Sequence, residues 1–126
     1  PGEAADYTHL MGYIYIQRKD LSTAKEYLQE SVKIRWWNAN VHYLLGSIYY
    51  TEAEESKSPE DYKNAEAELR AAVRINGKLA EARVVLAKTL LATGRKNEAV
   101  SQAKEALKTA RIPTTVAEAK AIIGKE

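Results

Sequence analysis

Two histidines are the side chains with the most versatile chemistry in this sequence, because imidazole can hold a metal or move a proton near neutral pH. His9 and His42 lie 33 residues apart, and neither has a histidine or carboxylate three or four residues further along the chain. Those positions would place a second ligand or a catalytic partner on the same helix face. We therefore predict ordinary histidines in a groove or on the surface, and no metal site.

Acidic side chains crowd one short stretch, which holds Glu52, Glu54, Glu55, Glu60 and Asp61. A calcium-binding loop needs alternating oxygen ligands around a central glycine, and this stretch has no glycine. We therefore interpret the acids as solvated charge around a loop.

Motifs for catalysis and cofactor binding are missing from the sequence. It contains neither glycine-rich phosphate-binding pattern, G-x-x-x-x-G-K-[ST] or G-x-G-x-x-G, and no G-x-S-x-G nucleophile motif. Its serines have no neighbouring motif that would activate them. The absence of cysteine rules out disulfides and thiolate metal sites. The sequence predicts a non-catalytic protein without a cofactor.

The composition is that of a globular domain. The chain has 126 residues, of which 45% are hydrophobic and 29% charged, and only three are proline. No apolar run reaches the roughly 18 residues that a membrane span needs. A net charge of +2 is too small to indicate nucleic acid by itself.

The chain begins Pro1-Gly2-Glu3 without an initiator Met, so we expect a fragment. The sequence does not determine the cellular compartment, for which the cytoplasm is the default expectation. A targeting signal or membrane anchor upstream of residue 1 is an open alternative.

Charge and aromatic residues are unevenly distributed along the chain. Residues 1–63 hold seven Lys and Arg against ten Asp and Glu, whereas residues 64–126 hold twelve against seven. All eight Tyr and both Trp lie between Tyr7 and Tyr62. An aromatic, acidic first half thus precedes a basic second half.

A repeat emerges from the spacing of small and aromatic residues. Gly12 and Gly46 are 34 residues apart, as are Tyr15 and Tyr49, and Ala65 and Ala99. Ala24 and Ala65 are 41 apart, which is one period and seven more residues. The distance from Tyr49 to Ala65 places this seven-residue insertion within Thr51–Asn64.

This period and these residue types resemble the tetratricopeptide repeat family, whose pattern is W-x2-L-G-x2-Y, then A-x3-F, then P. The matching residues are Thr8, Met11, Gly12, Tyr15, Ala24 and Leu28 in the first unit; His42, Leu45, Gly46, Tyr49, Ala65 and Leu69 in the second; and Arg83, Leu86, Ala87, Leu90, Ala99 and Ala103 in the third. The resemblance implies an all-α fold, an α-α superhelix of antiparallel helix hairpins. We expect one domain over 1–126, with repeats at about 5–38, 39–79 and 80–113 and a capping helix over 115–124.

Helical periodicity and end signals predict about seven helices, near 4–18, 21–35, 39–55, 59–76, 80–93, 96–110 and 115–124. Ser58-Pro59 begins one helix and the capping box Thr115–Glu118 another. Gly77 and Gly94 are expected in left-handed helix ends. Gly12, Gly46 and Ala87 are expected where paired helices cross closely, facing Ala24, Ala65 and Ala99. We expect the insertion to lengthen the third and fourth helices around a loop at Ser56–Ser58.

The resemblance also implies a binding surface, because the first helix of each unit lines a concave face that usually takes up peptide. The candidate partner-binding residues on this face are His9, Tyr13, Asn40, Tyr43, Ser47, Tyr50, Val84 and Lys88. Tyrosine combines apolar area with a hydroxyl at low entropic cost, which suits binding sites. Alternatively, Tyr13, Tyr43 and Tyr50 pack between adjacent first helices. Tyr15 and Tyr49 are expected in the core, and one of Trp36 and Trp37 between units.

One subset of the family binds the acidic tails of heat-shock chaperones with two lysines, two asparagines and one arginine on this face. The matching positions here are His9, Tyr13, Leu44, Glu81 and Val85, and none carries the required residue. We therefore expect no such carboxylate clamp.

The sequence thus predicts a scaffold for protein–protein interaction that binds a partner peptide or protein of unknown identity. The first alternative is a self-assembly module, with a homo-oligomer formed through exposed ends or the tryptophans. A third and weaker reading is nucleic-acid binding through Arg83, Lys88, Arg95, Lys96, Lys104 and Lys108. These basic residues lie on different helix faces and have no aromatic neighbours on which bases would stack.

Overall fold

The computed structural model describes the backbone of residues 2–125 and the side chains of residues 8–125. Pro1 and Glu126, the outer limits of the predicted domain, lie outside the described residues. Within the described part the chain forms seven helices and no strand. They are α1 Gly2–Gln17, α2 Leu21–Ile34, α3 Ala39–Ser56, α4 Pro59–Ile75, α5 Ala80–Ala92, α6 Lys96–Leu107 and α7 Pro113–Ile123. The predicted all-α fold is confirmed.

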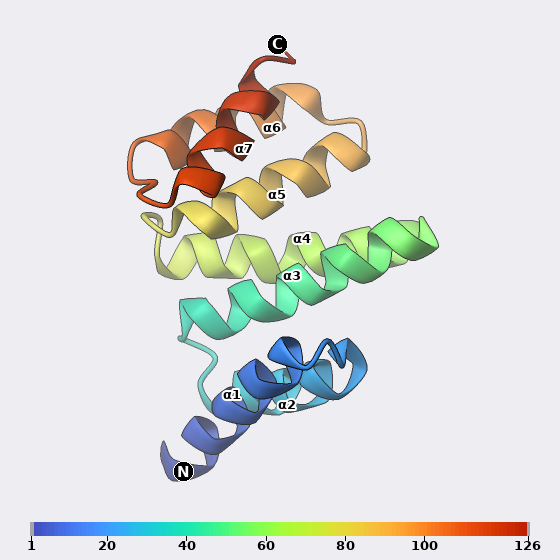
Figure 1. Ribbon diagram of the computed structural model, residues 1–126, viewed down its shortest axis with the longest axis vertical. Coiled ribbons are helices and arrows are strands. Elements are labelled where there is room, and N and C mark those ends of the chain that lie inside the picture. The colour runs from blue at the N-terminus through green and yellow to red at the C-terminus, as the bar shows by residue number, and fades with distance from the viewer. Residues whose placement is uncertain (1, 126) are drawn as a thin grey trace.

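The helices pair as antiparallel hairpins that stack along the long axis of the molecule. Figure 1 shows α1 and α2 at one end, α3 and α4 in the middle, and α5 and α6 beyond them with α7 alongside. The two chain ends lie at opposite ends of the stack. Each hairpin packs against the next one along the chain, as expected of a repeat array.

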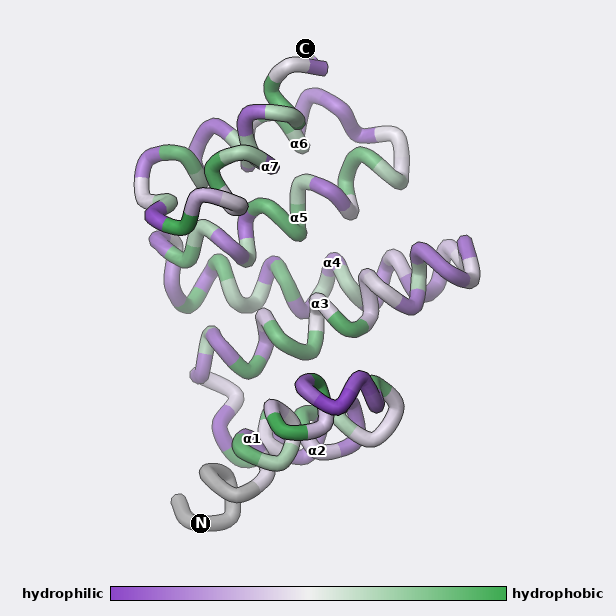
Figure 2. Tube along the Cα trace, in the orientation of Figure 1, coloured by the Kyte–Doolittle hydropathy of each residue, from purple (hydrophilic) through white to green (hydrophobic). Residues whose placement is uncertain are grey.

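The predicted insertion lengthens the middle hairpin, as expected. The middle helices α3 and α4 have 18 and 17 residues, against 13 and 12 for α5 and α6. Figure 2 shows that the far ends of α3 and α4, which project past the other hairpins, are mostly hydrophilic. The extra turns therefore add surface to the molecule instead of adding core.

The core has two parts, one toward each end of the stack. One consists of buried residues from the first hairpin and α3, and it includes Leu28 and Leu45. The other runs from α4 to α7 and includes Leu69 and Leu90. Tyr49 contacts both parts. Each part of the core contains residues from more than one hairpin, so the apolar side chains of a hairpin are buried only when the next hairpin packs on it.

Close helix crossings explain the glycines at the repeat positions. A β-carbon added to Gly12 would lie 2.7 Å from Cγ of Leu28, and one added to Gly46 would lie 2.7 Å from Cγ of Leu69. The expectation of close crossing is thus met, but leucines face these glycines, not the alanines that the sequence suggested. Ala24 and Ala65 are fully buried at neighbouring positions.

Helix ends differ in part from the predictions. Gly94 has the expected left-handed backbone with φ of +80°, but Gly77 does not have a positive φ. The predicted capping box at Thr115 is wrong, because α7 already begins at Pro113 and Thr115 is buried within its first turns. Proline supplies a φ suited to the first helical position, which favours the earlier start. Ser58 does cap α4 by position, but its hydroxyl makes no capping hydrogen bond.

The tryptophan pair lies outside the core. Trp36 is 67% and Trp37 54% exposed, and their rings meet edge to face with centroids 5.6 Å apart. The prediction that one of them packs between units is therefore wrong. Trp36 and Trp37 lie in the connector between α2 and α3. The backbone carbonyl of Trp36 accepts a 2.6 Å hydrogen bond from Nε2 of His42, so the main chain holds this connector in place without burying either ring.

Tyr15 and Tyr49 are half-buried and pack against the core. The ring of Tyr15 stacks on Tyr27, with centroids 5.6 Å apart. The hydroxyl of Tyr49 accepts a 2.9 Å hydrogen bond from Nε2 of Gln29, which joins α3 to the preceding hairpin. Both rings thus help to fix one hairpin or join two.

Candidate peptide-binding face

The predicted site residues lie on α1, α3 and α5, which are the first helices of the three hairpins. We call the surface formed by His9, Tyr13, Asn40, Tyr43, Ser47, Tyr50 and Lys88 the first-helix face. Tyr13 is 51% exposed and Asn40 is exposed, whereas the other five are half-buried. Helices α3 and α5 are in contact, as are α5 and α7, so this face continues toward the C-terminal helix.

Val84 does not belong to this face. Only 3% of it is exposed, and it packs in the core shared by α4 to α7. Val84 does lie on the first helix of its hairpin, as predicted. However, α5 contacts α3, α4, α6 and α7, which leaves little of its surface exposed. Val84 is therefore removed from the candidate site.

Tyr43 and Tyr50 combine packing with partial exposure. Both rings pack against the core of the second and third hairpins, in line with the packing alternative. Burial raises the pKa of the Tyr43 hydroxyl. Burial and then a hydrogen bond with the Glu54 carboxylate raise the pKa of Tyr50 well above the usual range. Both hydroxyls are therefore neutral hydrogen-bonding groups at physiological pH.

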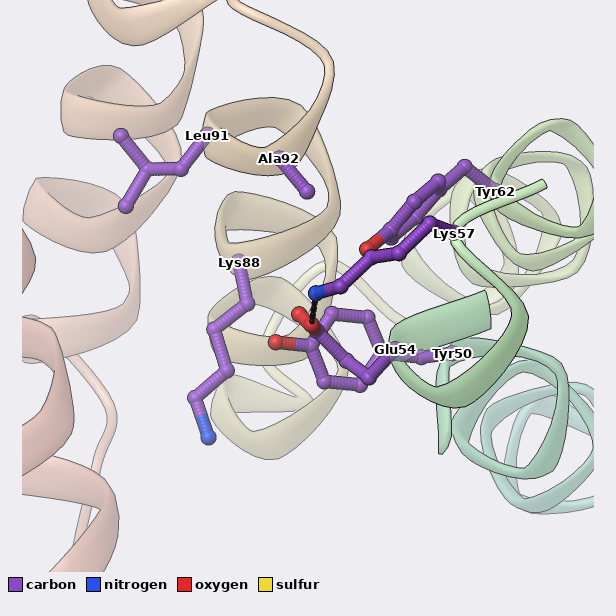
Figure 3. A pocket seen from close by; sticks show the side chains of 7 residues that line it. All are labelled: Tyr50, Glu54, Lys57, Tyr62, Lys88, Leu91 and Ala92. Carbon is purple, nitrogen blue, oxygen red and sulfur yellow. Dashed lines mark hydrogen bonds and ion pairs between the residues drawn. The ribbon is translucent and has the colours of Figure 1, made fainter. Parts of the chain in front are cut away.

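An open pocket adjoins the first-helix face where α3, α4 and α5 meet. Its volume is about 530 Å³, and its lining residues are Tyr50, Glu54, Lys57, Tyr62, Lys88, Leu91 and Ala92. Figure 3 shows these side chains, with Leu91, Ala92 and Lys88 coming from α5 on one side. Aromatic and aliphatic walls with a few polar groups are the usual make-up of a ligand pocket.

The polar groups of the pocket are arranged around the Glu54 carboxylate. Nζ of Lys57 donates a 2.8 Å hydrogen bond to Glu54, drawn as a dashed line in Figure 3. The Lys57 ammonium and then the Tyr50 hydroxyl lower the pKa of Glu54, and Tyr62 adds a smaller effect of the same sign. Glu54 is thus ionised and faces donors from three side chains.

Lys88 is held from the other side. Its ammonium forms an ion pair with Glu118 of α7, and Figure 3 shows it pointing away from Glu54. Lys88 was predicted as a partner-binding residue, and its ion pair with the C-terminal helix means that a partner would have to compete with Glu118 for its ammonium.

Sequence reasoning missed Glu54, Lys57 and Tyr62 as parts of a site. The acids were interpreted as solvated charge, and Tyr62 was given no role. All three lie within Thr51–Asn64, the stretch that contains the insertion and breaks the 34-residue period. The insertion was therefore the available signal, since extra residues in a repeat array are concentrated at one surface and often at the binding face.

His42 is buried, not part of a groove or the surface as predicted. It is 7% exposed, with Nδ1 at 2.8 Å from Oε1 of Glu68 and Nε2 at 2.6 Å from the Trp36 carbonyl oxygen. Among the residues that the structure describes, no group of three or more His, Cys, Asp or Glu could hold a metal ion. In the same part of the chain, no helix is long and apolar enough to cross a membrane.

Antiparallel helix hairpins stacked one on the next define a helical-repeat protein. Two family models of the tetratricopeptide repeat match the sequence, over residues 5–35 and 79–112. The chain belongs to the tetratricopeptide repeat family. The hairpin that carries the insertion lies between these two matches.

Solved structures show the same fold at low sequence identity. The Arabidopsis OM64 TPR domain is similar with a TM-score of 0.83, at 18% identity over 98% of each chain. The first TPR of Spaghetti (RPAP3), bound to the HSP90 peptide SRMEEVD, gives 0.81 at 15% identity over 98% of this chain and 95% of that one. The second TPR domain of human RPAP3, in complex with the HSP70 peptide SGPTIEEVD, gives 0.75 at 16% identity over 94% and 98%. No curated protein sequence matches the chain.

Proposed function

We propose that this chain is a non-catalytic scaffold that binds a partner peptide or protein on the first-helix face, which we take to be the concave face of the array. The observation that carries the proposal is the run of tyrosines on that face, with Tyr13 half exposed and Tyr50 opening into the pocket. Such rings give large contact area at low entropic cost. Structural relatives that hold peptides support the same reading.

The test is selection of peptides from a random library on the wild-type domain, followed by affinity measurements on variants. Tyr13→Ala is the decisive variant, because Tyr13 is exposed enough for truncation to spare the core. We expect a loss of about tenfold or more in affinity with an unchanged melting temperature. Tyr43 and Tyr50 pack on the core, so Tyr50→Phe, which removes only the hydroxyl, replaces truncation there.

Trp37→Ala is the matched control, since it removes an exposed aromatic ring that lies off the first-helix face. If Tyr13→Ala leaves every selected peptide bound and Trp37→Ala releases them, the assignment of the face is wrong.

The domain is expected not to bind acidic chaperone tails, although relatives do. Of the five positions where a clamp would stand, Leu44 and Val85 are partly buried against the core and Glu81 is negatively charged. A titration with a peptide ending in Glu-Glu-Val-Asp should show no binding. Micromolar affinity that disappears when the terminal carboxylate is amidated would contradict this expectation.

Self-assembly is the second candidate function, and the exposed Trp36–Trp37 pair favours it. Light scattering coupled to size-exclusion chromatography separates the two. A dimer that Trp36→Ala together with Trp37→Ala dissociates would favour assembly.

Nucleic-acid binding receives little support from the basic side chains. Arg95 forms an ion pair with Glu66, and Lys108 lies 2.8 Å from Glu105. Arg83 donates to the Gly77 carbonyl and to Gln102. Cations that are engaged within the fold would have to exchange partners to bind phosphate.

A further inference from the structure

The inserted segment builds one side of the pocket beside the first-helix face. Glu54 lies in the last turns of α3, Lys57 in the turn that follows, and Tyr62 in the first turns of α4. Tyr50, Leu91 and Ala92, which occupy regular repeat positions, complete the lining. Figure 3 shows Ala92 on the side of Lys57 and Tyr62, whereas the Leu91 side chain points away from them. The pocket therefore exists because the second hairpin is longer than the third.

Glu54 is the only carboxylate among the residues that line this pocket. Only part of its side chain is exposed, at 37%, and the rings of Tyr50 and Tyr62 lie beside it. A partly exposed carboxylate beside two tyrosines is suited to a cation, because the reduced access of water strengthens an ion pair. An anionic ligand would instead meet the charge of Glu54.

The carboxylate already holds a primary ammonium, and this group comes from the same chain. Nζ of Lys57 lies 2.8 Å from Oε2 of Glu54. The Lys57 side chain is 70% exposed, and its residue forms the left-handed end of α3 with φ of 57°. Exposed ion pairs of this kind contribute little to stability, so Lys57 can leave Glu54 at small cost.

The second lysine of the pocket does not oppose a cationic ligand strongly. The positive charge of Lys88 is balanced by Glu118 on α7. With Lys57 returned to water, Glu54 would keep only the electrostatic attraction of Lys88, whose ammonium is paired with Glu118.

We propose that the pocket takes up a lysine or arginine side chain of the partner, with Glu54 as its counterion and Lys57 as a built-in occupant that the partner's cation displaces. The exchange conserves charge, since one ammonium replaces another on Glu54 while Lys57 becomes hydrated. This inference rests on the proposed function, because the side chain would belong to a partner lying on the first-helix face.

Single amino-acid probes test the pocket apart from the rest of the face. The probe is Nα-acetyl-lysine amide, whose side-chain ammonium is free, titrated at low salt and followed by backbone amide NMR shifts. Nα-acetyl-norleucine amide lacks the ammonium, and Nα-acetyl-glutamate amide carries the opposite charge. We expect the lysine probe alone to shift the amides of Tyr50, Glu54 and Ala92, with millimolar affinity.

Two pairs of variants identify the groups responsible. Glu54→Gln should weaken the lysine probe about tenfold, whereas Glu55→Gln, an exposed neighbour off the pocket, should leave it unchanged. Lys57→Gln should strengthen binding about threefold by removing the competing ammonium, and Lys63→Gln should not. Melting temperatures establish that each variant is folded.

The outcomes separate this inference from the proposed function. Binding of the lysine probe that Glu54→Gln weakens about tenfold supports the inference, and so does binding detected only in Lys57→Gln. Equal shifts from norleucine, stronger shifts from glutamate, or no probe binding in wild type and Lys57→Gln alike would overturn it. If library peptides bind through Tyr13 while the probe fails, the proposed function survives and the pocket assignment does not. The reverse pattern removes the peptide-binding face and leaves a cation pocket.

Discussion

At the residue scale, His42 has both ring nitrogens against hydrogen-bond acceptors. Nδ1 faces the Glu68 carboxylate at 2.8 Å and Nε2 faces the Trp36 carbonyl oxygen at 2.6 Å. A neutral imidazole has one donor nitrogen, so only the doubly protonated ring can donate both hydrogen bonds. The hydrogen bond with Glu68 is the main cause that raises the pKa of His42 above its usual 6.5. Burial lowers this pKa, and the hydrogen bond to the Trp36 carbonyl raises it again.

This geometry predicts that stability depends on pH. Because the folded pKa of His42 exceeds its unfolded value near 6.5, its contribution is complete below 6.5 and is lost as pH rises through the folded pKa. Urea unfolding followed from about pH 6 to pH 9 should show the free energy of unfolding falling. If the neutral ring keeps the proton that faces Glu68, the hydrogen bond to the Trp36 carbonyl is lost, and tryptophan fluorescence should change over the same range.

The dependence on pH should vanish in His42→Asn and shrink in Glu68→Gln, but persist in His9→Asn, which keeps the buried histidine. A flat profile in the wild type, or an unchanged one in His42→Asn, would show that His42 is not protonated in this way.

At the element scale, all three hairpins turn through a single left-handed residue. Lys19, Lys57 and Gly94 have φ of 63°, 57° and 80°, and they occupy equivalent positions once the insertion is counted. Only the third turn uses glycine, although left-handed backbone disfavours a side chain. The packing of the two helices in each hairpin therefore requires a left-handed residue in the turn, whether or not that residue is glycine.

Two glycines that look alike in sequence should respond in opposite ways to alanine. Gly94→Ala is expected to destabilise the domain by about 1–2 kcal/mol, because φ of 80° disfavours a β-carbon although the space is open. Gly77→Ala should be neutral or slightly stabilising, because its φ is not positive and the nearest atom, at 3.3 Å, is at the end of the long Arg83 side chain, which can shift by a few tenths of an ångström. Thermal or urea unfolding of both variants measures this difference. Equal losses would imply that Gly77 also needs a left-handed backbone.

At the scale of the whole molecule, each hairpin is stabilised by its contacts with the next hairpin along the chain. One core part spans the first hairpin and α3, and the other spans α4 to α7, with Tyr49 in contact with both. Lys25 of α2 and Glu52 of α3 add an ion pair at 2.9 Å across the first junction. In such arrays each unit is stabilised mainly by its nearest neighbours.

Loss of packing at α7 should therefore be felt most strongly nearby. Ile122 is buried against the third hairpin, so Ile122→Ala is expected to cost about 2–4 kcal/mol. Amide hydrogen exchange should accelerate in α5 and α6 far more than in α1 and α2. Ala121→Ser, at the exposed neighbouring position, is the control and should change neither. Uniform acceleration over all seven helices would instead indicate a single cooperative unit.

Much of the architecture was determined by the sequence alone. The 34-residue period, the seven-residue insertion within Thr51–Asn64 and seven helices with ends close to those observed all follow from it. These features are local or periodic. Helix periodicity, proline and glycine act within a few residues, and small side chains at a crossing recur at the same place in every unit.

Tertiary structure alone decided which side chains are available for binding. Val84 became core, Lys88 was paired with Glu118, 30 residues away, and His42 was paired with Glu68, 26 residues away. It also placed Glu54, one of the acids that looked merely solvated, in the wall of a pocket. The physical reason is that burial and pairing depend on side chains brought together by the stacking of hairpins. Sequence spacing gives the face of a helix, but only the neighbouring helices determine how much of that face stays open.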